Sequence, residues 1–237
     1  MRLIPLAGLA LLLAVVPPRP ALSAPWDGQP KLLLHVRPPI VQSPCANHGA
    51  LGDCVEAVTS GGLTTPAEGP YYFVYLLAAR GTSMTGVAEV RCGIDYQGGA
   101  AGAIGDRVGI DVLAWRSCAT IDNISTGAPE WPRPGGGITI RWDLPESCQE
   151  GEAAVAGYFY IGAYSADVLR LAAEPVSGIA SLRNCQSALV TLDAGRDLGS
   201  AAFSSGGTEN GCNPCDIACD DMPVLPSTWG GIKSLLD

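Results

Sequence analysis

The sequence predicts an all-β protein, an antiparallel β-sandwich with one short helix and long loops closed by disulfide bonds. The 237-residue chain contains 30 glycines and 19 prolines, which interrupt it at short intervals. Between these breaks lie runs rich in Val, Ile, Tyr and Trp, the residue types that favour strands. Short runs of this kind with turn residues between them are typical of a sandwich.

Nine segments are predicted to be strands, because each is a short apolar or aromatic run bounded by turn residues. They span residues 31–37, 71–79, 86–96, 108–121, 137–143, 153–164, 168–173, 179–185 and 188–193. The intervals 129–137 and 195–211 are expected to be long loops within one domain, since no change in composition accompanies them.

Alternation of apolar and polar residues indicates which side of a strand faces the core. Val90, Cys92 and Ile94 occupy alternate positions, with charged residues among the positions between and beside them. Residues two apart on a strand share a face, so we expect these three to point inward. The segment 138–142 has the same pattern and is expected to turn Trp142 into the core.

One short helix is expected at residues 50–58. Cys54, Val55 and Val58 would lie on one side of it, and two glycines follow. Cys45 precedes Cys54 closely in the chain, so a local disulfide bond between them is expected to hold this segment against the sheet.

Residues 1–23 have the pattern of a secretory signal peptide. An apolar run from Leu3 to Val16 follows one arginine, and small residues stand at positions 21 and 23. The run is shorter than the roughly 20 residues that a membrane-spanning helix needs. We therefore expect residues 24–211 to form one β-sandwich domain, residues 212–237 to form a cysteine-rich tail with a short terminal helix, and the protein to be secreted, to the extracellular space or the periplasm.

The charge balance excludes two classes of partner. The chain has 23 acidic and 14 basic residues, a formal net charge of −9. Nucleic acids and anionic membranes are recognised through clusters of positive charge, so neither is expected to bind. No segment after residue 23 is long and apolar enough to span a membrane.

Nine cysteines follow the predicted signal peptide, and an oxidising compartment favours disulfide bonds between them. Because nine is an odd number, at least one thiol is left without an intramolecular disulfide partner. The candidates are Cys45, Cys54, Cys92, Cys118, Cys148, Cys185, Cys212, Cys215 and Cys219.

The last three, Cys212, Cys215 and Cys219, form a C-x2-C-x3-C pattern. A metal site, a redox centre and a disulfide staple are the alternatives. Zinc and iron–sulfur sites usually need four ligands, and a C-x-x-C redox motif needs a thioredoxin-like strand and helix around it. The sequence offers neither. The staple is therefore favoured, no metal and no cofactor are expected, and one of these three is the leading candidate for the odd thiol.

Several longer segments carry a resemblance. They are Y-Y-F-V-Y-L-L from Tyr71, G-V-A-E-V-R-C-G-I-D-Y from Gly86, W-R-S-C-A-T, I-R-W-D, A-V-A-G-Y-F-Y-I-G-A-Y-S-A-D and S-T-W-G-G-I-K-S-L-L. Together they resemble a loose group of uncharacterised exported bacterial proteins. The segment from Gly86, with G-I-D-V-L-A-W from Gly109, is also similar to cohesin-like and immunoglobulin-like modules. The resemblance implies secretion and a β-sandwich, and it implies no activity.

No catalytic residues are predicted. A serine hydrolase needs a histidine beside its nucleophile, and His35 lies in a predicted strand while His48 lies in a polar turn, without a G-x-S-x-G motif. Glycoside hydrolases use two carboxylates, which keeps an extracellular carbohydrate-active hydrolase as the alternative. The acidic residues available for it are Asp95, Asp111, Asp143, Glu146, Glu150 and Glu152.

Two aromatic features are candidates for binding. Trp131 lies between two prolines in a predicted loop and is the tryptophan least typical of a core, so it is a candidate for stacking on a ligand such as a sugar. Trp229, Ile232 and Leu236 would share one side of a short terminal helix. Docking of this segment on its own domain is expected, and recognition by a surface-attachment partner is the alternative.

The leading hypothesis is a secreted, non-catalytic binding or structural module. The signal peptide, the strand pattern, the cysteines and the absence of a convincing catalytic set support it. Self-assembly at the cell surface, through the odd cysteine or an unpaired edge strand, is a variant of this hypothesis. The expected partner is an unidentified extracellular protein, a glycan or other copies of the same chain.

Overall fold

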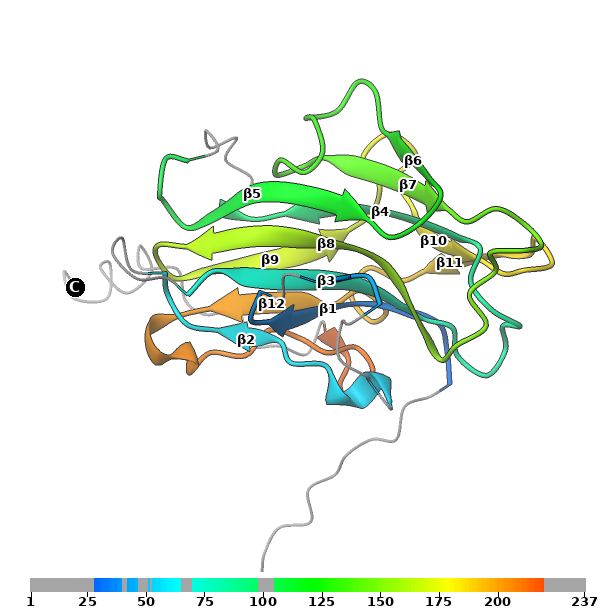
Figure 1. Ribbon diagram of the computed structural model, residues 1–237, viewed down its shortest axis with the longest axis horizontal. Helices are drawn as coiled ribbons and strands as arrows, with labels where there is room; N and C mark the ends of the chain where they lie inside the picture. Colours follow the sequence, from blue (N-terminus) through cyan, green and yellow to red (C-terminus); the bar gives the residue numbers. More distant parts are fainter. Residues whose placement is uncertain are drawn as a thin grey trace, which may run out of the picture.

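In the computed structural model, two β-sheets pack face to face (Figure 1). The structure describes residues 28–39, 42–46, 51, 53–64, 70–97 and 105–219. This architecture confirms the predicted all-β sandwich. The predicted signal peptide, His48, Trp229, Ile232 and Leu236 lie outside the described residues.

The first sheet has four antiparallel strands in the order β1-β3-β8-β5, with β1 at one edge and β5 at the other (Figure 1). The strands are β1 (Lys31–Arg37), β3 (Tyr72–Ala79), β8 (Ala153–Ala163) and β5 (Ile110–Ser117). Neighbouring strands run antiparallel along nearly their full length, so side chains form continuous rows across the sheet.

The second sheet has eight strands and is centred on β4. One edge of β4 pairs with β7, which pairs with β6, and its other edge is shared by β10 and β9. All these pairings are antiparallel, and only β12 with β2 is parallel among the described strands. The strands are β2 (Ser60–Gly61), β4 (Glu89–Asp95), β6 (Ile121–Ile124), β7 (Gly137–Arg141), β9 (Asp167–Ala172), β10 (Ala180–Arg183), β11 (Leu189–Leu192) and β12 (Ser200–Phe203).

Each of the nine predicted segments holds a strand, with ends that differ by a few residues. The short strands β2, β6 and β12 were not predicted, and β12 lies in the interval 195–211 that was expected to be a loop. All four residues of β12 are buried, so the alternation that reveals a half-exposed strand is absent there.

The helix expected at residues 50–58 is reduced to one 3-10 turn, Cys54–Glu56, capped by the Asp53 carboxylate, which accepts a hydrogen bond from Val55 N at 3.3 Å. Val55 and Val58 are exposed, and only Cys54 of the predicted apolar side is buried. The chain extends at Val58 because its carbonyl accepts a hydrogen bond from Val36 N at the edge of β1.

The main core lies between the sheets and contains the predicted inward residues Val90, Cys92, Ile94 and Trp142. Trp131 also belongs to this core. The residue is only 4% exposed, and its ring centroid lies 5.2 Å from that of Trp115 and 5.5 Å from that of Phe159. The proline-rich segment is a loop as expected, but it directs this side chain inward, so Trp131 is not an exposed platform for a ligand.

The free edge of β1 is closed by residues 197–199. Leu32 N donates to the carbonyl of Asp197 at 2.9 Å, and Gly199 N donates to the carbonyl of Leu32 at 2.8 Å. Beside these bonds the buried Lys31 Nζ lies 2.8 Å from Asp197 Oδ1. This segment leads into β12, so it joins the two sheets and covers an edge that would otherwise be open to pairing.

Four disulfide bonds use eight of the nine cysteines: Cys45–Cys118, Cys54–Cys215, Cys148–Cys185 and Cys212–Cys219. The expected local bond between Cys45 and Cys54 is not formed, because both cysteines reach partners brought near by the fold. The C-x2-C-x3-C pattern is a disulfide staple. Cys212 bonds to Cys219 within the pattern, and Cys215 bonds to Cys54 in the domain.

Cys92, and not a tail cysteine, is the free thiol. It lies on the inward face of β4 in the main core, where no other cysteine is within bonding reach. Burial, with a smaller contribution from the charge of Glu174, raises the pKa of the Cys92 thiol to about 12. The thiol is therefore neutral at physiological pH and unreactive while the core stays closed.

Candidate functional site

Within the described residues, the outer face of the four-stranded sheet is covered at one end and has no cover at the other. At the covered end, Leu33, Leu77 and Val155 form a second small core with Cys54 and Cys215. The Cys54–Cys215 disulfide bond thus fixes the segments 53–57 and 211–217 over this part of the sheet. Burial falls toward the other end, where half-buried aromatic side chains replace the aliphatic ones.

These aromatic side chains form a continuous cluster, here called the aromatic face, made of Tyr71, Phe73, Tyr158, Tyr160 and Tyr164. All five are half-buried. The Phe73 ring is central, with its centroid 4.7 Å from that of Tyr158 and 5.7 Å from that of Tyr160, and Tyr71 lies 5.4 Å from Tyr160. The cross-strand register produces this cluster, because Tyr160 on β8 lies directly opposite Phe73 on β3.

Tyr164 is fixed at the far end of the aromatic face. A side-chain hydrogen bond with Tyr71, together with burial, raises the pKa of Tyr164. Gly162 leaves room for this ring, since a Cβ there would come within 3.0 Å of the Tyr164 hydroxyl. The Arg107 guanidinium carbon lies 5.9 Å from the ring centroid, within cation–π range.

Positive charge borders the aromatic face on both edges of the sheet. Arg37 at the end of β1 is opposite Phe73, and Arg116 on β5 is opposite Tyr158. Both arginines and Arg107 are exposed. Within the described residues, no acidic side chain lies within 4.0 Å of any of these three guanidinium groups. An acidic protein therefore presents a locally cationic, aromatic surface here.

The residues considered for catalysis lie on several different elements, and His35 and Asp111 have structural contacts. Buried His35 accepts a hydrogen bond from Val58 N at its Nδ1 atom (2.9 Å), which holds the covering segment. The buried Asp111 carboxylate accepts hydrogen bonds from the backbone N–H groups of Gly105 and Arg107. Asp143, Glu146 and Glu150 are exposed in the connection between β7 and β8, and Glu152 is half-buried there.

The described residues contain no group of three or more His, Cys, Asp or Glu side chains placed to hold a metal ion. In the same part of the chain, no helix has the length and apolar character required to cross a membrane.

Sequence reasoning missed the aromatic face, although its signal was present. Tyr71 and Phe73 are two residues apart, as are Tyr158 and Tyr160, so each pair must share a side of its strand. The hydrophobic pattern alone does not tell which side of a sheet is inner. The sequence therefore singles out Trp131, which is in the core, and does not distinguish Tyr158 and Tyr160 from core residues.

The fold and the aromatic face define a disulfide-bonded β-sandwich with an aromatic surface on the outer face of its four-stranded sheet. No protein-family model matches the chain, and no curated protein matches it. The fold of this chain is distantly similar to that of cohesin modules. A cohesin module from a family 33 glycoside hydrolase of Clostridium perfringens has 8% sequence identity and a TM-score of 0.41, and the match covers 74% of this chain and 98% of that module.

Two further cohesins are similar at the same distance. The sixth cohesin of scaffoldin B from Acetivibrio cellulolyticus, solved with a Cel5 dockerin, has 9% identity and a TM-score of 0.41, with 74% of this chain and 99% of that chain covered. A type I cohesin from Clostridium thermocellum, also in a cohesin–dockerin complex, has 9% identity and a TM-score of 0.39, with 62% and 91% covered. Similarity this distant carries no argument about the partners of this chain.

Proposed function

We propose that the protein is a non-catalytic, secreted binding module that docks a partner protein on its aromatic face. The observation that carries this proposal is the composition of that face: four tyrosines and a phenylalanine, bordered by arginines. Tyr, Phe and Arg are enriched at protein interfaces, and energetic hot spots are enriched in Tyr and Arg, whereas Lys, Glu and Asp are depleted there. The four disulfide bonds support secretion into an oxidising compartment.

The partner is expected to be a different protein rather than a second copy. A two-fold dimer through this face would bring the same surface patch together from both copies. Arg37, Arg107 and Arg116 would then face arginines of the other copy, and like charges across an interface oppose association. A partner with apolar anchors and acidic side chains at the rim matches the face.

A peptide library tests this proposal without a known partner. Random peptides displayed on phage would be selected on the wild-type protein, and the binding of the selected peptides measured by biolayer interferometry. We expect acidic, apolar peptides whose affinity falls about tenfold or more with Tyr160→Ser or Arg37→Gln, the loss typical of one hot-spot contact. Val176→Ser, in an exposed turn after β9, is the matched control and should change nothing.

Three results would argue against the proposal. Selected peptides that bind the Tyr160 and Arg37 variants as well as wild type would exclude the aromatic face as the binding surface. A neutral oligosaccharide bound through Tyr160 on a glycan array would make the module a carbohydrate binder instead. A dimer in size-exclusion chromatography with light scattering that Tyr160→Ser dissociates would make a second copy the occupant. Melting curves of each variant separate loss of binding from loss of fold.

The terminal segment is the remaining element of the proposal. We retain the prediction that Trp229, Ile232 and Leu236 dock on the domain itself. Deletion of residues 229–237 tests it, since peptide affinity for the aromatic face should be unchanged if the segment docks elsewhere and should rise if it occupies that face. A drop in thermal stability without a change in affinity supports docking at another site, whereas no change in either would contradict docking.

A further inference from the structure

The outer face of the eight-stranded sheet, on the side of the molecule opposite the aromatic face, holds three arginines around one buried glutamate. Glu89 on β4 is directly opposite Arg141 on β7 and Arg183 on β10, and Arg91 follows two residues later on β4. Arg141 Nε lies 2.7 Å and Arg183 Nε lies 3.5 Å from the same oxygen, Glu89 Oε2, while Arg91 Nη2 lies 3.8 Å from Oε1. The sheet register therefore makes three guanidinium groups converge on one carboxylate.

This cluster has more positive charge than the carboxylate neutralises. Glu89 is the only acidic residue within 4.0 Å of these guanidinium groups in the described part of the chain. One carboxylate against three guanidinium groups leaves two positive charges on the face of an acidic protein. The arginine side chains are 27%, 47% and 33% exposed for Arg91, Arg141 and Arg183, so solvent and ligands reach them.

The same place also has unused hydrogen-bonding capacity. Glu89 Oε1, Arg91 Nε and Ser181 Oγ are buried and make no hydrogen bond to another described residue. Ser181 is directly opposite Arg91 on the neighbouring strand and is fully buried. Buried polar atoms are nearly always paired, and an unpaired group calls for an explanation such as an ordered water or a bound ion. Three of them together indicate a polar site that the protein alone does not complete.

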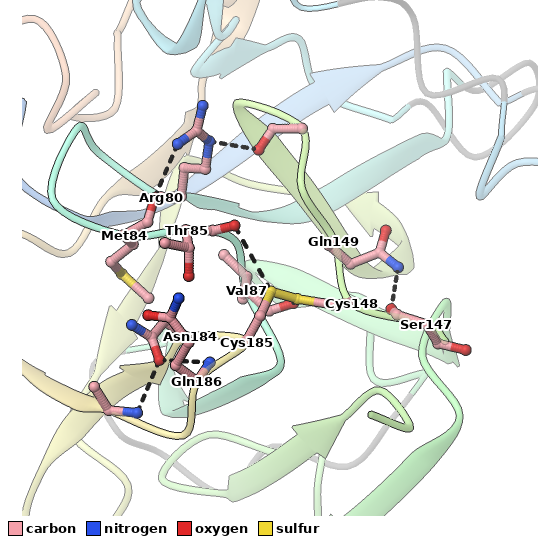
Figure 2. Close-up of a disulfide and its surroundings, with 12 residues drawn as sticks. Arg80, Met84, Thr85, Val87, Ser147, Cys148, Gln149, Asn184, Cys185 and Gln186 are labelled. Atoms are coloured by element: carbon pink, nitrogen blue, oxygen red, sulfur yellow. Dashed lines mark hydrogen bonds between the residues drawn. A yellow bond between two sulfur atoms is a disulfide. The ribbon is translucent and has the colours of Figure 1, made fainter. Parts of the chain in front are cut away.

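Arg183 is held in place before any ligand arrives. Its Nη1 atom donates to the carbonyl of Ser187 at 2.9 Å, across the turn between β10 and β11. Asn184 Oδ1 accepts hydrogen bonds from Gln186 N and Ala188 N in the same turn. Figure 2 shows how the Cys148–Cys185 disulfide bond ties this turn to the connection after β7. Such rigidity lowers the entropy cost of binding.

We propose that this cluster, formed by Arg91, Arg141 and Arg183 around Glu89, binds the carboxylate or sulfate group of an acidic glycan. Guanidinium groups bind oxyanions through paired N–H donors, and the Nε atoms of Arg141 and Arg183 are already turned toward Glu89, which leaves Nη donors for a ligand. The inference concerns the sheet opposite the aromatic face and does not depend on the proposed protein partner.

The cross-strand row through Arg91 favours a glycan over an acidic polypeptide. Thr139 and Ser181 flank Arg91, and beyond them lie Asn123 and Thr191 in the same cross-strand row. These hydroxyl and amide groups match the many hydroxyls of a sugar chain. This row contains no large apolar side chain of the kind that a peptide would use as an anchor. In the adjacent row through Glu89, the exposed Ile121 and Leu189 lie only at the outer ends, beyond Arg141 and Arg183.

Isothermal titration calorimetry with defined probes tests the site. The probe is a hyaluronan hexasaccharide, which has one carboxylate in every disaccharide, and the matched neutral probe is chitohexaose. We expect the hyaluronan fragment alone to bind, with affinity that falls as salt is raised. Arg141→Gln with Arg183→Gln should weaken binding by about tenfold to a hundredfold, the worth of one or two charged hydrogen bonds. Arg170→Gln, on the same sheet but outside the cluster, should leave the affinity unchanged.

Glu89→Gln distinguishes a ligand site from a purely structural network. Removal of the central negative charge should tighten binding of the hexasaccharide several-fold while the melting temperature falls, because the arginines lose their internal counter-ion. An unchanged or weaker affinity in a folded Glu89→Gln protein would overturn the proposal, as would equal binding by wild type and the double arginine variant. Hexaglutamate that binds more tightly than hyaluronan at equal salt would assign the site to an acidic polypeptide instead.

Discussion

The buried ion pair at the edge of β1 allows a quantitative prediction. Lys31 and Asp197 have side chains 2% and 6% exposed, and Lys31 Nζ lies 2.8 Å from Asp197 Oδ1. Lys31→Met keeps a similar chain length but leaves a carboxylate buried without its main counter-ion. Removal of one partner of a buried pair costs about 3–5 kcal/mol. Asp197 retains a hydrogen bond from Asp193 N at 2.9 Å and a contact to Arg196 Nε at 3.3 Å, so we expect the lower end, about 3 kcal/mol.

The pH dependence gives this prediction a second check. Burial alone would raise the pKa of Asp197, but the hydrogen bond and charge of Lys31, with the Asp193 backbone N–H, hold the pKa below its ordinary value of 3.8. A depressed carboxyl pKa contributes stability that is present above 3.8 and is lost as pH falls through the folded pKa. In Lys31→Met the same carboxyl becomes easier to protonate. The stability difference between wild type and variant should therefore shrink toward pH 3.

Urea unfolding under non-reducing conditions, followed by tryptophan fluorescence, measures both effects. The loss of about 3 kcal/mol at pH 7 corresponds to a melting temperature lower by about 6–12 °C for a domain of this size. Arg196→Met, which removes an exposed contact to the same carboxylate, is the matched control and should cost less than about 1 kcal/mol. The double change Lys31→Met with Asp197→Leu should recover most of the loss. A loss below about 1 kcal/mol at pH 7, or one that does not change between pH 7 and pH 3, would refute the reasoning.

Three further predictions follow from the disulfide pattern and the buried acids. Native protein should give no product with a thiol reagent, and unfolding without reductant should release one reactive thiol, Cys92. A reactive thiol in the folded state would contradict its burial, and a second one after unfolding would contradict the disulfide pairing. Glu174→Gln should lower stability by roughly 2–3 kcal/mol above pH 5, because burial alone would raise the pKa of this carboxyl but four hydrogen bonds lower it from 4.5 to about 2. In urea unfolding, this stability difference should disappear as pH falls to about 2, and a difference that stays constant with pH would argue against the prediction. Cys54→Ala with Cys215→Ala should lower the free energy of unfolding by about 2–5 kcal/mol. It should also increase binding of the dye ANS, because the cover over the second core loosens. Intact protection of the β1 and β3 amides in hydrogen exchange would show that the cover holds without the bond.

The sequence predicted the sandwich because most strands expose one face and bury the other. Val90, Cys92 and Ile94 could be assigned to the core from their alternation alone. Strand β12 could not be found this way, since all four of its residues are buried. Five glycines in residues 195–211 also pointed to a loop. Its strand is determined by pairing with β9 and β2, which are distant in the chain.

The candidate sites were harder to predict, since each depends on what lies above a sheet. Tyr158 and Tyr160 share a side of β8, but only the covering segment held by Cys215 determines where that side is closed. The arginine cluster needs the register of three strands, because Arg91, Arg141 and Arg183 are far apart in the sequence. Disulfide connectivity is also a property of the folded path, which is why the proximity of Cys45 to Cys54 in the chain was misleading.

The bond between Cys54 and Cys215 has a further consequence. It joins points 161 residues apart, so most of the domain is a covalently closed ring. A single protease cut in any connection inside that ring leaves both pieces attached to each other through the disulfide bond. Cleavage at one site in the ring therefore does not release a fragment.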